Sequence, residues 1–341
     1  MKKLLVLLTL FAGSVNIYAQ SLTATLQQGD SVSVFFGIYA FRDACKSASD
    51  GAVITLSAGQ FQGGHSIYKS ITVYGIYAFG SKDSQNTVIN GTPHILADSV
   101  HFEGIKFYDI NLGGNSLGWK EITNFHIKRC WIERQFTAYC THYNTLVDQC
   151  VVKTDKAIEN GVNYKIQNST LGKFGAMNTS ANIAKITNCV VWEWVYGKNN
   201  TDYYKQPYAI YINNILGDGN NANYTYTTST NSEFYHNLFI NTAGVYGNII
   251  FTVVFPSGID GGNISGVEYG EYYKSGSLRQ YPAAKPYNGA TLGMDGTWIG
   301  TYGGTGFKDY PGIPRIISSS IDSYTDAEGK LNVKIKARAE Q

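Results

Sequence analysis

A short hydrophobic unit recurs along the middle of the chain with a period of about 20 residues. It begins as "IKRCWI" at Ile127, "VDQCVV" at Val147, "IQNSTL" at Ile166 and "ITNCVV" at Ile186, so the intervals are 20, 19 and 20 residues. Looser versions follow, the first of them "INNILG" at Ile212. The units are rich in β-branched residues at strand spacing, which favours short stacked strands over leucine-rich repeats. The repeat therefore predicts a solenoid of coils spaced about 4.8 Å apart.

Aligning the units predicts which side chains stack on one another. The first column is apolar and should be buried: Ile127, Val147, Ile166, Ile186 and Ile212. Two positions later comes a column rich in amides, in which Asn tolerates the left-handed conformation of a sharp corner: Arg129, Gln149, Asn168, Asn188 and Asn214. A second apolar ladder is expected from Ile132, Val152, Leu171 and Val191, and a column of small residues from Ala138, Ala157 and Ala176.

Cysteines fall into the column that directly follows the corner. This column is Cys130, Cys150, Ser169, Cys189 and Ile215. The alternatives are a metal site, a redox pair and a ladder of small buried side chains. CxxC spacing is absent and the column accounts for each of these cysteines, so we expect buried, reduced thiols.

Both ends of a solenoid need caps. Near the start, Phe41, Ala44, Cys45 and Ala48 fall on one face of a short predicted helix. The periodicity is lost between residues 256 and 315, where the chain is predicted to be loop-rich and either to pack along the coils or to form the far cap. The final "KLNVKIKARAEQ" alternates apolar and charged residues, as expected of a strand that blocks an edge.

The expected fold class is thus all-β: a right-handed parallel β-helix with a short N-terminal helical cap and a loop-rich C-terminal region. Residues 1–19 have the charged start, apolar run and small residue of a secretory signal peptide, which leaves the β-helix with its cap at 20–255 and the loop-rich region at 256–341. We expect a protein that is secreted, periplasmic or on the cell surface, without a membrane span. A net charge of +2 gives no reason to expect nucleic acid.

The chain resembles the pectate-lyase-like superfamily of right-handed parallel β-helices, as found in secreted bacterial proteins. The resemblance rests on "ACKSASDGAVITLSAGQF", on the repeated "ITNCVV", "IQNSTL" and "VDQCVV" units, and on "GKLNVKIKARAEQ". It implies a polysaccharide partner more often than any other. The sequence has no Asp-Asp pair and no Arg-x-Lys, so no catalytic subfamily is matched and the catalytic residues stay unknown.

Carboxylates for glycoside hydrolysis are available in the central coils at Glu133, Asp148, Asp155 and Glu159. The alternative is that they are ordinary charges beside neighbouring Lys and Arg residues. The six histidines show no metal-ligand spacing, and we expect no metal and no cofactor.

Aromatic rings offer a stronger indication, because they stack on sugar faces. Trp131 lies in a repeat unit, and the interval after Ile186 lengthens to 26 residues in "WEWVYGKNNTDYYKQPY". We expect a substrate-binding loop there, formed by Trp192, Trp194, Tyr196, Asp202, Tyr203, Tyr204 and Lys205. The alternative is that these rings only cover the flank of a coil. The sequence therefore predicts an exported protein that binds, and possibly cleaves, a polysaccharide or glycan; the alternative is a structural or adhesive surface module.

Overall fold

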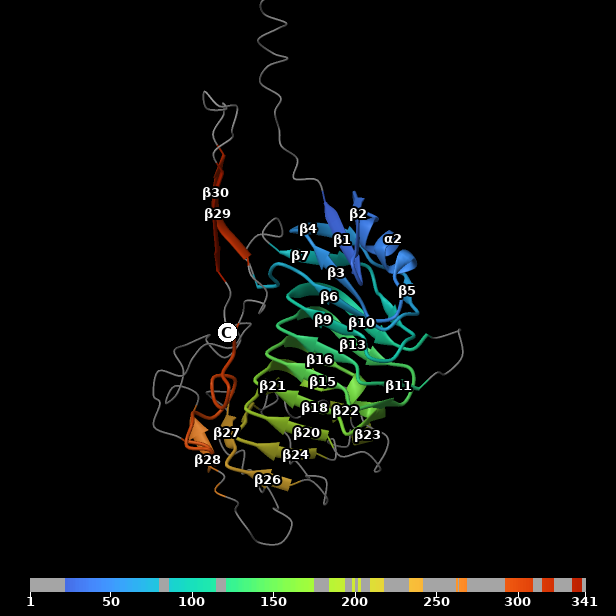
Figure 1. Ribbon diagram of the computed structural model, residues 1–341. Coiled ribbons are helices and arrows are strands. Elements are labelled where there is room, and N and C mark those ends of the chain that lie inside the picture. The colour runs from blue at the N-terminus through green and yellow to red at the C-terminus, as the bar shows by residue number, and fades with distance from the viewer. Residues whose placement is uncertain are drawn as a thin grey trace, which may run out of the picture.

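Two long, mainly parallel sheets run the length of the molecule in a solenoid-like arrangement (Figure 1). The computed structural model describes residues 22–79, 86–114, 121–174, 184–193, 198–199, 202–203, 209–217, 233–241, 262, 264–268, 292–308, 315–321 and 333–338. All structural statements below concern these residues.

The sheet that we call sheet A has eleven strands. In spatial order they are β2 (Ser31–Phe36), β1 (Thr23–Gln28), β3 (Ala52–Leu56), β6 (Ile71–Tyr74), β9 (His101–Glu103), β12 (His126–Lys128), β15 (Leu146–Asp148), β18 (Lys165–Gln167), β20 (Ala184–Thr187), β24 (Ala209–Ile212) and β26 (Glu233–Tyr235). From β3 onward every pairing is parallel.

Sheet B has twelve strands. In order they are β28 (Ile264–Glu268), β27 (Leu238–Asn241), β25 (Ile215–Gly217), β21 (Val190–Glu193), β19 (Thr170–Phe174), β16 (Val151–Asp155), β13 (Trp131–Ala138), β10 (Ile105–Leu112), β7 (Thr87–Asn90) and β4 (Gly59–Gln62), with β8 (His94–Ile95) paired to β10 and β5 (Ser66–Ile67) paired to β8. A smaller sheet C joins β11 (Ile122–Thr123), β14 (His142–Tyr143) and β17 (Gly161–Val162). The short 3-10 helix η2 (Ala157–Asn160) leads into β17.

The predicted apolar column is confirmed in its first four members. Ile127 pairs with Val147, Val147 with Ile166 and Ile166 with Ile186. All four side chains are fully buried. The second ladder, Ile132, Val152, Leu171 and Val191, is likewise in register along sheet B. Alternate residues of each strand therefore line one continuous core, as the repeat predicts.

The fifth member of each column was predicted one residue too far along. Ile186 pairs with Tyr211, not Ile212, and the buried Tyr211 ring stacks on Phe234 with 4.9 Å between ring centres. The corner is consequently Asn213, with φ of 56°, and not Asn214. Because Asn213 and Asn214 are adjacent, the repeat can be aligned with either of them at the corner. Burial of the Tyr211 ring selects the alignment with Asn213 at the corner.

Left-handed backbone at the corner is confirmed. Arg129, Gln149, Asn168, Asn188, Asn213 and His236 have φ between 46° and 56°. The preceding turn has Gly104 at the equivalent place, with φ of 72°. A second corner, which the alignment did not reveal, joins sheets C and A at Asn124, Asn144 and Asn163, and Ser99 has the same left-handed backbone one coil earlier. The Asn163 amide donates to Asn144 Oδ1 over 2.6 Å, so this corner is also linked from coil to coil.

The column after the corner is a hydrogen-bonded ladder. Cys150 Sγ accepts the backbone N–H of Cys130 (3.4 Å) and donates to the carbonyl of Asp148 (3.1 Å). Ser169 Oγ does the same for the N–H of Cys150 and the carbonyl of Gln167. Asn214, where Ile215 was predicted, accepts the N–H of Cys189. All five cysteines are buried and unpaired, as expected for the three in this column.

The N-terminal cap contains a helix and a hairpin. Helix α2 (Ala40–Ser47) buries Phe41, Ala44 and Cys45, which confirms the predicted face. The hairpin of β1 and β2 was not predicted, and it adds two antiparallel strands to the edge of β3. At the other end of the chain, β30 (Val333–Arg338) pairs with β29 (Arg315–Ile321) in a sheet of its own and not with a long sheet. No helix among the described residues is long and apolar enough to cross a membrane.

Candidate functional site

The predicted binding loop lies largely outside the described residues, which exclude Trp194, Tyr196, Tyr204 and Lys205. Trp192 is on β21, where the register turns it away from the buried Val191, and it is partly buried. Asp202 and Tyr203 form β23 (Asp202–Tyr203), which pairs with β22 (Lys198–Asn199) in a small hairpin whose side chains are not described. The described residues therefore leave the predicted loop site untested.

The candidate catalytic carboxylates have separate partners. Glu133 pairs with Lys153 on sheet B, and Asp148 lies on sheet A. Asp155 is buried in the core, where it accepts the Tyr164 hydroxyl over 2.6 Å and the N–H of Ala157 over 2.9 Å. The side chain of Glu159 is outside the described residues. Glu133 and Asp148 thus lie beside lysines, whereas Asp155 is a buried structural carboxylate held by a hydroxyl and a backbone N–H.

Three of the six histidines lie in strands of sheet A or sheet C: His101, His126 and His142. His142 is fully buried, and its Nδ1 and Nε2 lie 2.7 Å from Thr145 Oγ1 and the Ala157 carbonyl. Burial lowers the pKa of His142 to about 4. The sequence spacing did not suggest a contact between His101 and His126. Their rings stack on adjacent strands with 4.5 Å between ring centres. Within the described residues, no group of three or more His, Cys, Asp or Glu side chains could hold a metal ion.

A C-terminal segment follows the corner of the coils, and we call residues 292–308 the strap (Figure 1). Asn213 Oδ1 accepts the N–H of Met294, and Asn168 donates to the carbonyls of Thr301 and Gly303. The strap thus runs against the order of the coils, from Asn213 back toward Gln149. Within the region predicted to be loop-rich, residues 292–308 pack along the coils and Ile264–Glu268 adds a strand to sheet B, while most of the rest lies outside the described residues.

The strap contains several glycines because it packs closely on the outer face of sheet B. Val190 and Ile215 point outward from sheet B yet are almost fully buried, because the strap lies on them. A Cβ on Gly300 would lie 2.7 Å from Ile215 Cδ1, and one on Gly303 would lie 2.3 Å from Asn188 Nδ2. Real Cβ atoms do not approach so closely, and a Cβ on Gly303 would also meet the Trp298 carbonyl oxygen, so glycine is required at that position.

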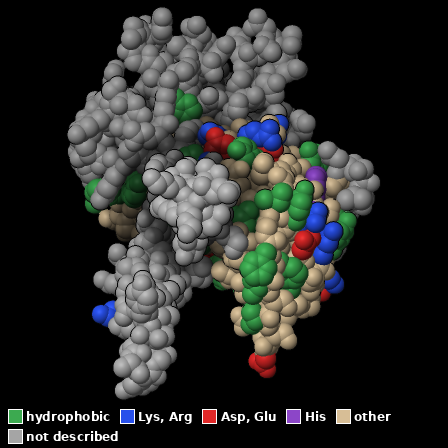
Figure 2. All heavy atoms as spheres, turned by 90° about the horizontal axis from the view of Figure 1, so that it is seen from above, with side chains coloured by type: hydrophobic (Ala, Val, Ile, Leu, Met, Phe, Trp, Pro, Cys, Tyr) green, Lys and Arg blue, Asp and Glu red, His purple; other side chains and the backbone are tan. Residues whose placement is uncertain are grey.

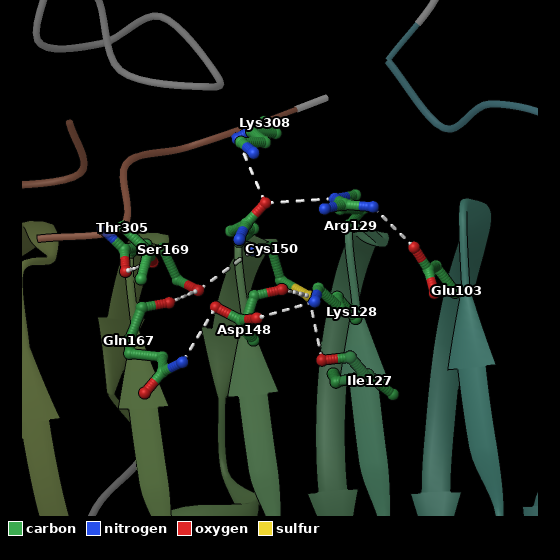
Figure 3. Close-up of polar contacts among 12 residues, drawn as sticks. Glu103, Ile127, Lys128, Arg129, Asp148, Cys150, Gln167, Ser169, Thr305 and Lys308 are labelled. Atoms are coloured by element: carbon green, nitrogen blue, oxygen red, sulfur yellow. Dashed lines mark hydrogen bonds and ion pairs between the residues drawn. The ribbon is translucent and has the colours of Figure 1, made fainter. Parts of the chain in front are cut away.

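The strap ends in a polar network at the corner (Figure 3). Gln149 Oε1 accepts the backbone N–H of Lys308 over 3.2 Å and Arg129 Nε over 3.1 Å. Arg129 is itself buried and donates to Glu103 over 2.8 Å. On the sheet A side, Asp148 accepts Gln167 and lies 3.6 Å from Lys128 Nζ. Removing one member of the Arg129–Glu103 pair would leave a costly unpaired charge, and the strap joins this network through the N–H of Lys308.

Beside this end of the strap, rings from three distant segments form what we call the ring cluster: Tyr77, Phe79, Trp131, Tyr302 and Phe307. Phe79 is central, with ring centres 6.0 Å from Trp131 and 5.3 Å from Phe307. All five residues are partly buried, so each keeps some exposed surface. Lys106 Nζ lies 5.8 Å from the centre of the Trp131 ring, within cation–π range.

Charged groups border the ring cluster on the same sheet. Glu133 and Lys153 form an ion pair on β13 and β16, and Arg134 of β13 pairs with Asp109 of β10. Rings can stack on the apolar face of a sugar while ion-paired side chains bond its hydroxyls. Sequence reasoning singled out Trp131 but not its partners, since Phe79 and Phe307 are 228 residues apart in the chain. For the strap, the available sequence signal was its closely spaced glycines, which indicate a segment that packs tightly against other backbone.

The described structure is that of an all-β protein built on long parallel sheets, with an aromatic and charged patch on one outer face. No known protein family, curated protein or solved structure matches the chain.

Proposed function

We propose that this is an exported right-handed parallel β-helix of the pectate-lyase-like kind that binds a polysaccharide or glycan. The parallel pairing along both long sheets supports the architecture. Crossovers between parallel strands of one sheet are right-handed in about 98% of cases, which supports the handedness. Export rests on the predicted signal peptide at residues 1–19.

The observation that carries the binding proposal is the ring cluster. Phe79, Trp131 and Phe307 bring partly exposed rings together on the outside of sheet B, beside the cation of Lys106. Trp192 lies on the outer face of the same sheet, three strands further along. With strands about 4.8 Å apart, the two tryptophans are separated by roughly 15 Å across the sheet, a span suited to a linear polymer.

One observation favours the alternative of a structural or adhesive module without a sugar site. The rings of Phe307 and Tyr302 belong to the strap, and their edge-to-face contacts with each other and with Phe79 also fasten the strap to the coils. Aromatic pairs of this geometry stabilise packing by about 0.5–1.5 kcal/mol each beyond their area burial. Under this alternative, the only role of the ring cluster is to hold the strap against the coils.

A binding panel distinguishes the two proposals. The protein without its predicted signal peptide is incubated with a range of insoluble and immobilised polysaccharides, and the bound fraction is measured against protein concentration. Saturable retention on one class of polysaccharide, abolished by soluble fragments of the same polymer, supports the binding function. Retention on none of them supports the structural module.

Cleavage is a separate question for the same samples. Uronic-acid polymers and any retained polysaccharide are incubated with the protein, and unsaturated products and reducing ends are followed with time. Because the visible carboxylates are engaged in separate structural contacts, we expect binding without release of either product. Steady product release would instead assign a catalytic role.

A further inference from the structure

The outermost strand of sheet A has the features of an interaction surface. β2 is paired on one side with β1, and its other edge has no partner among the described residues. Exposed edges in natural sheets are usually blunted by a charge, a proline or a bulge. β2 reads SVSVFF and pairs with β1 without a break in register, so it has none of these devices.

Apolar side chains project from the outer face of this strand. Val34 lies opposite Thr25 of β1, and the flanking Ala24 and Leu26 face the core. Val32, Val34 and Phe36 therefore point away from the core, and they are 62%, 47% and 69% exposed. Seen from above, at the cap end, hydrophobic side chains lie open on the surface (Figure 2). Alternation normally places polar residues outward, and β2 reverses it.

The strand is complementary to a copy of itself. Directly opposed residues of an antiparallel pair share one face of the sheet. If two β2 strands pair about a twofold axis at Val34, then Val34 meets Val34 of the second copy and Val32 meets its Phe36. Ser33 then meets Phe35 on the other face. No charged residue lies in β2, so self-pairing meets no repulsion between like charges.

Other occupants are less well supported. Cleavage after Ala19, as the sequence predicts, leaves only Gln20 and Ser21 ahead of Leu22, and Leu22 is already fixed by its carbonyl, which accepts the N–H of Gly37. The chain's own N-terminus would then be too short to cover β2. A charged partner strand finds no opposite charge within Ser31–Phe36.

We propose that β2 is a homodimer interface, through which two copies join their A sheets edge to edge in antiparallel register about Val34. A twofold interface of this kind is closed, so association stops at two copies. The contact consists of one short strand and three apolar side chains from each copy, so the dimer should dissociate on dilution.

Charge variants test the register directly. Sedimentation of the chain without its predicted signal peptide should show a reversible monomer–dimer equilibrium. Val34→Lys and Val34→Asp should each be monomeric, because like charges would meet at the axis, and an equimolar mixture of the two should recover dimers. Gln27→Lys, on the outer face of β1 and away from the edge, should dimerise like the native protein.

Crosslinking gives an independent readout. Val34→Cys should form an intermolecular disulfide under mild oxidation, whereas Ser33→Cys should not, because its side chain would face Phe35. The native thiols contribute little background, since all five are buried. A monomer at every concentration, a dimer that survives Val34→Lys, or assembly beyond two copies would each overturn the proposal.

Discussion

At the residue scale, the coils are specified by side chains that complete backbone hydrogen bonds at one corner. An unsatisfied buried N–H costs about 1–3 kcal/mol, and each turn of the chain creates a new one where sheet A ends. Cys150, Ser169 and Asn214 are chemically different, yet each accepts an N–H from the neighbouring coil. The position therefore selects hydrogen-bonding capacity as well as small size.

A pair of substitutions at Cys150 separates these two requirements. Cys150→Ser keeps both hydrogen bonds, as Ser169 does, and should change the free energy of unfolding by less than about 1 kcal/mol. Cys150→Val fills the space but leaves the N–H of Cys130 unpaired, while the carbonyl of Asp148 keeps the N–H of Arg129, and it should cost about 1–3 kcal/mol. Urea denaturation of the two variants measures the difference. If valine were the better tolerated, size alone would define the column.

Buried His142 makes the fold sensitive to acid. Its folded-state pKa of about 4 lies below the unfolded value near 6.5, so only the unfolded chain binds this proton between those pH values. Its contribution to stability is therefore unchanged above about pH 6.5 and falls by up to about 3 kcal/mol as the pH drops to about 4.

The measurement is the free energy of unfolding across that pH range for the native protein and for His142→Gln. Glutamine does not titrate, so the variant should be less stable at neutral pH but should have a shallower dependence on pH. Parallel curves for the two proteins would show that His142 does not control the acid sensitivity.

At the element scale, the strap is a glycine-bearing segment that covers Val190 and Ile215 on the outer face of sheet B, next to the corner. Gly303 has no room for a side chain, since a Cβ there would lie 1.7 Å from the Trp298 carbonyl oxygen. Gly296 is in the same strap with nothing within 4 Å of its would-be Cβ. Both glycines lie in the strap, but only Gly303 is closely packed. Gly296 therefore serves as the control position for a substitution at Gly303.

Gly303→Ala should therefore release the strap, and Gly296→Ala should not. We expect Gly303→Ala to lower the free energy of unfolding by about 1–3 kcal/mol, as overpacking does. Hydrogen exchange in residues 292–308 should rise in this variant, whereas Gly296→Ala, whose cost is confined to its left-handed backbone, should retain protection. Equal exchange in both variants would show that the strap does not depend on the close packing around Gly303.

The sequence was informative wherever structure is local or periodic. The column of Ile127, the corner at Arg129 and the face of helix α2 all follow from spacing and were found in place. The error at Ile212 arose because Asn213 and Asn214 fit the repeat equally well until Tyr211 is seen in the core. The strap could not be placed, because its contacts with Asn168 span more than 130 residues and have no period.

At the scale of the whole molecule, the long sheets act as a frame that brings distant segments to one outer face. Phe79 comes from an early coil, Trp131 from a central one and Phe307 from the strap, and only the stacked coils make them neighbours. The same frame exposes β2 at the cap end. We thus propose carbohydrate recognition on the outer face of sheet B and self-association at the cap end.

The proposal that the ring cluster binds a glycan is tested most directly by titrating the retained polysaccharide into the native protein, Trp131→Ala and Trp192→Ala, with calorimetry as the readout and thermal unfolding as the check on folding. The account predicts that Trp131→Ala, while still folded, loses at least about tenfold in affinity, equivalent to about 1.4 kcal/mol. Trp192→Ala should weaken binding less, by shortening the contacted stretch. Unchanged affinity in a folded Trp131→Ala variant would contradict the assignment of the site to the ring cluster.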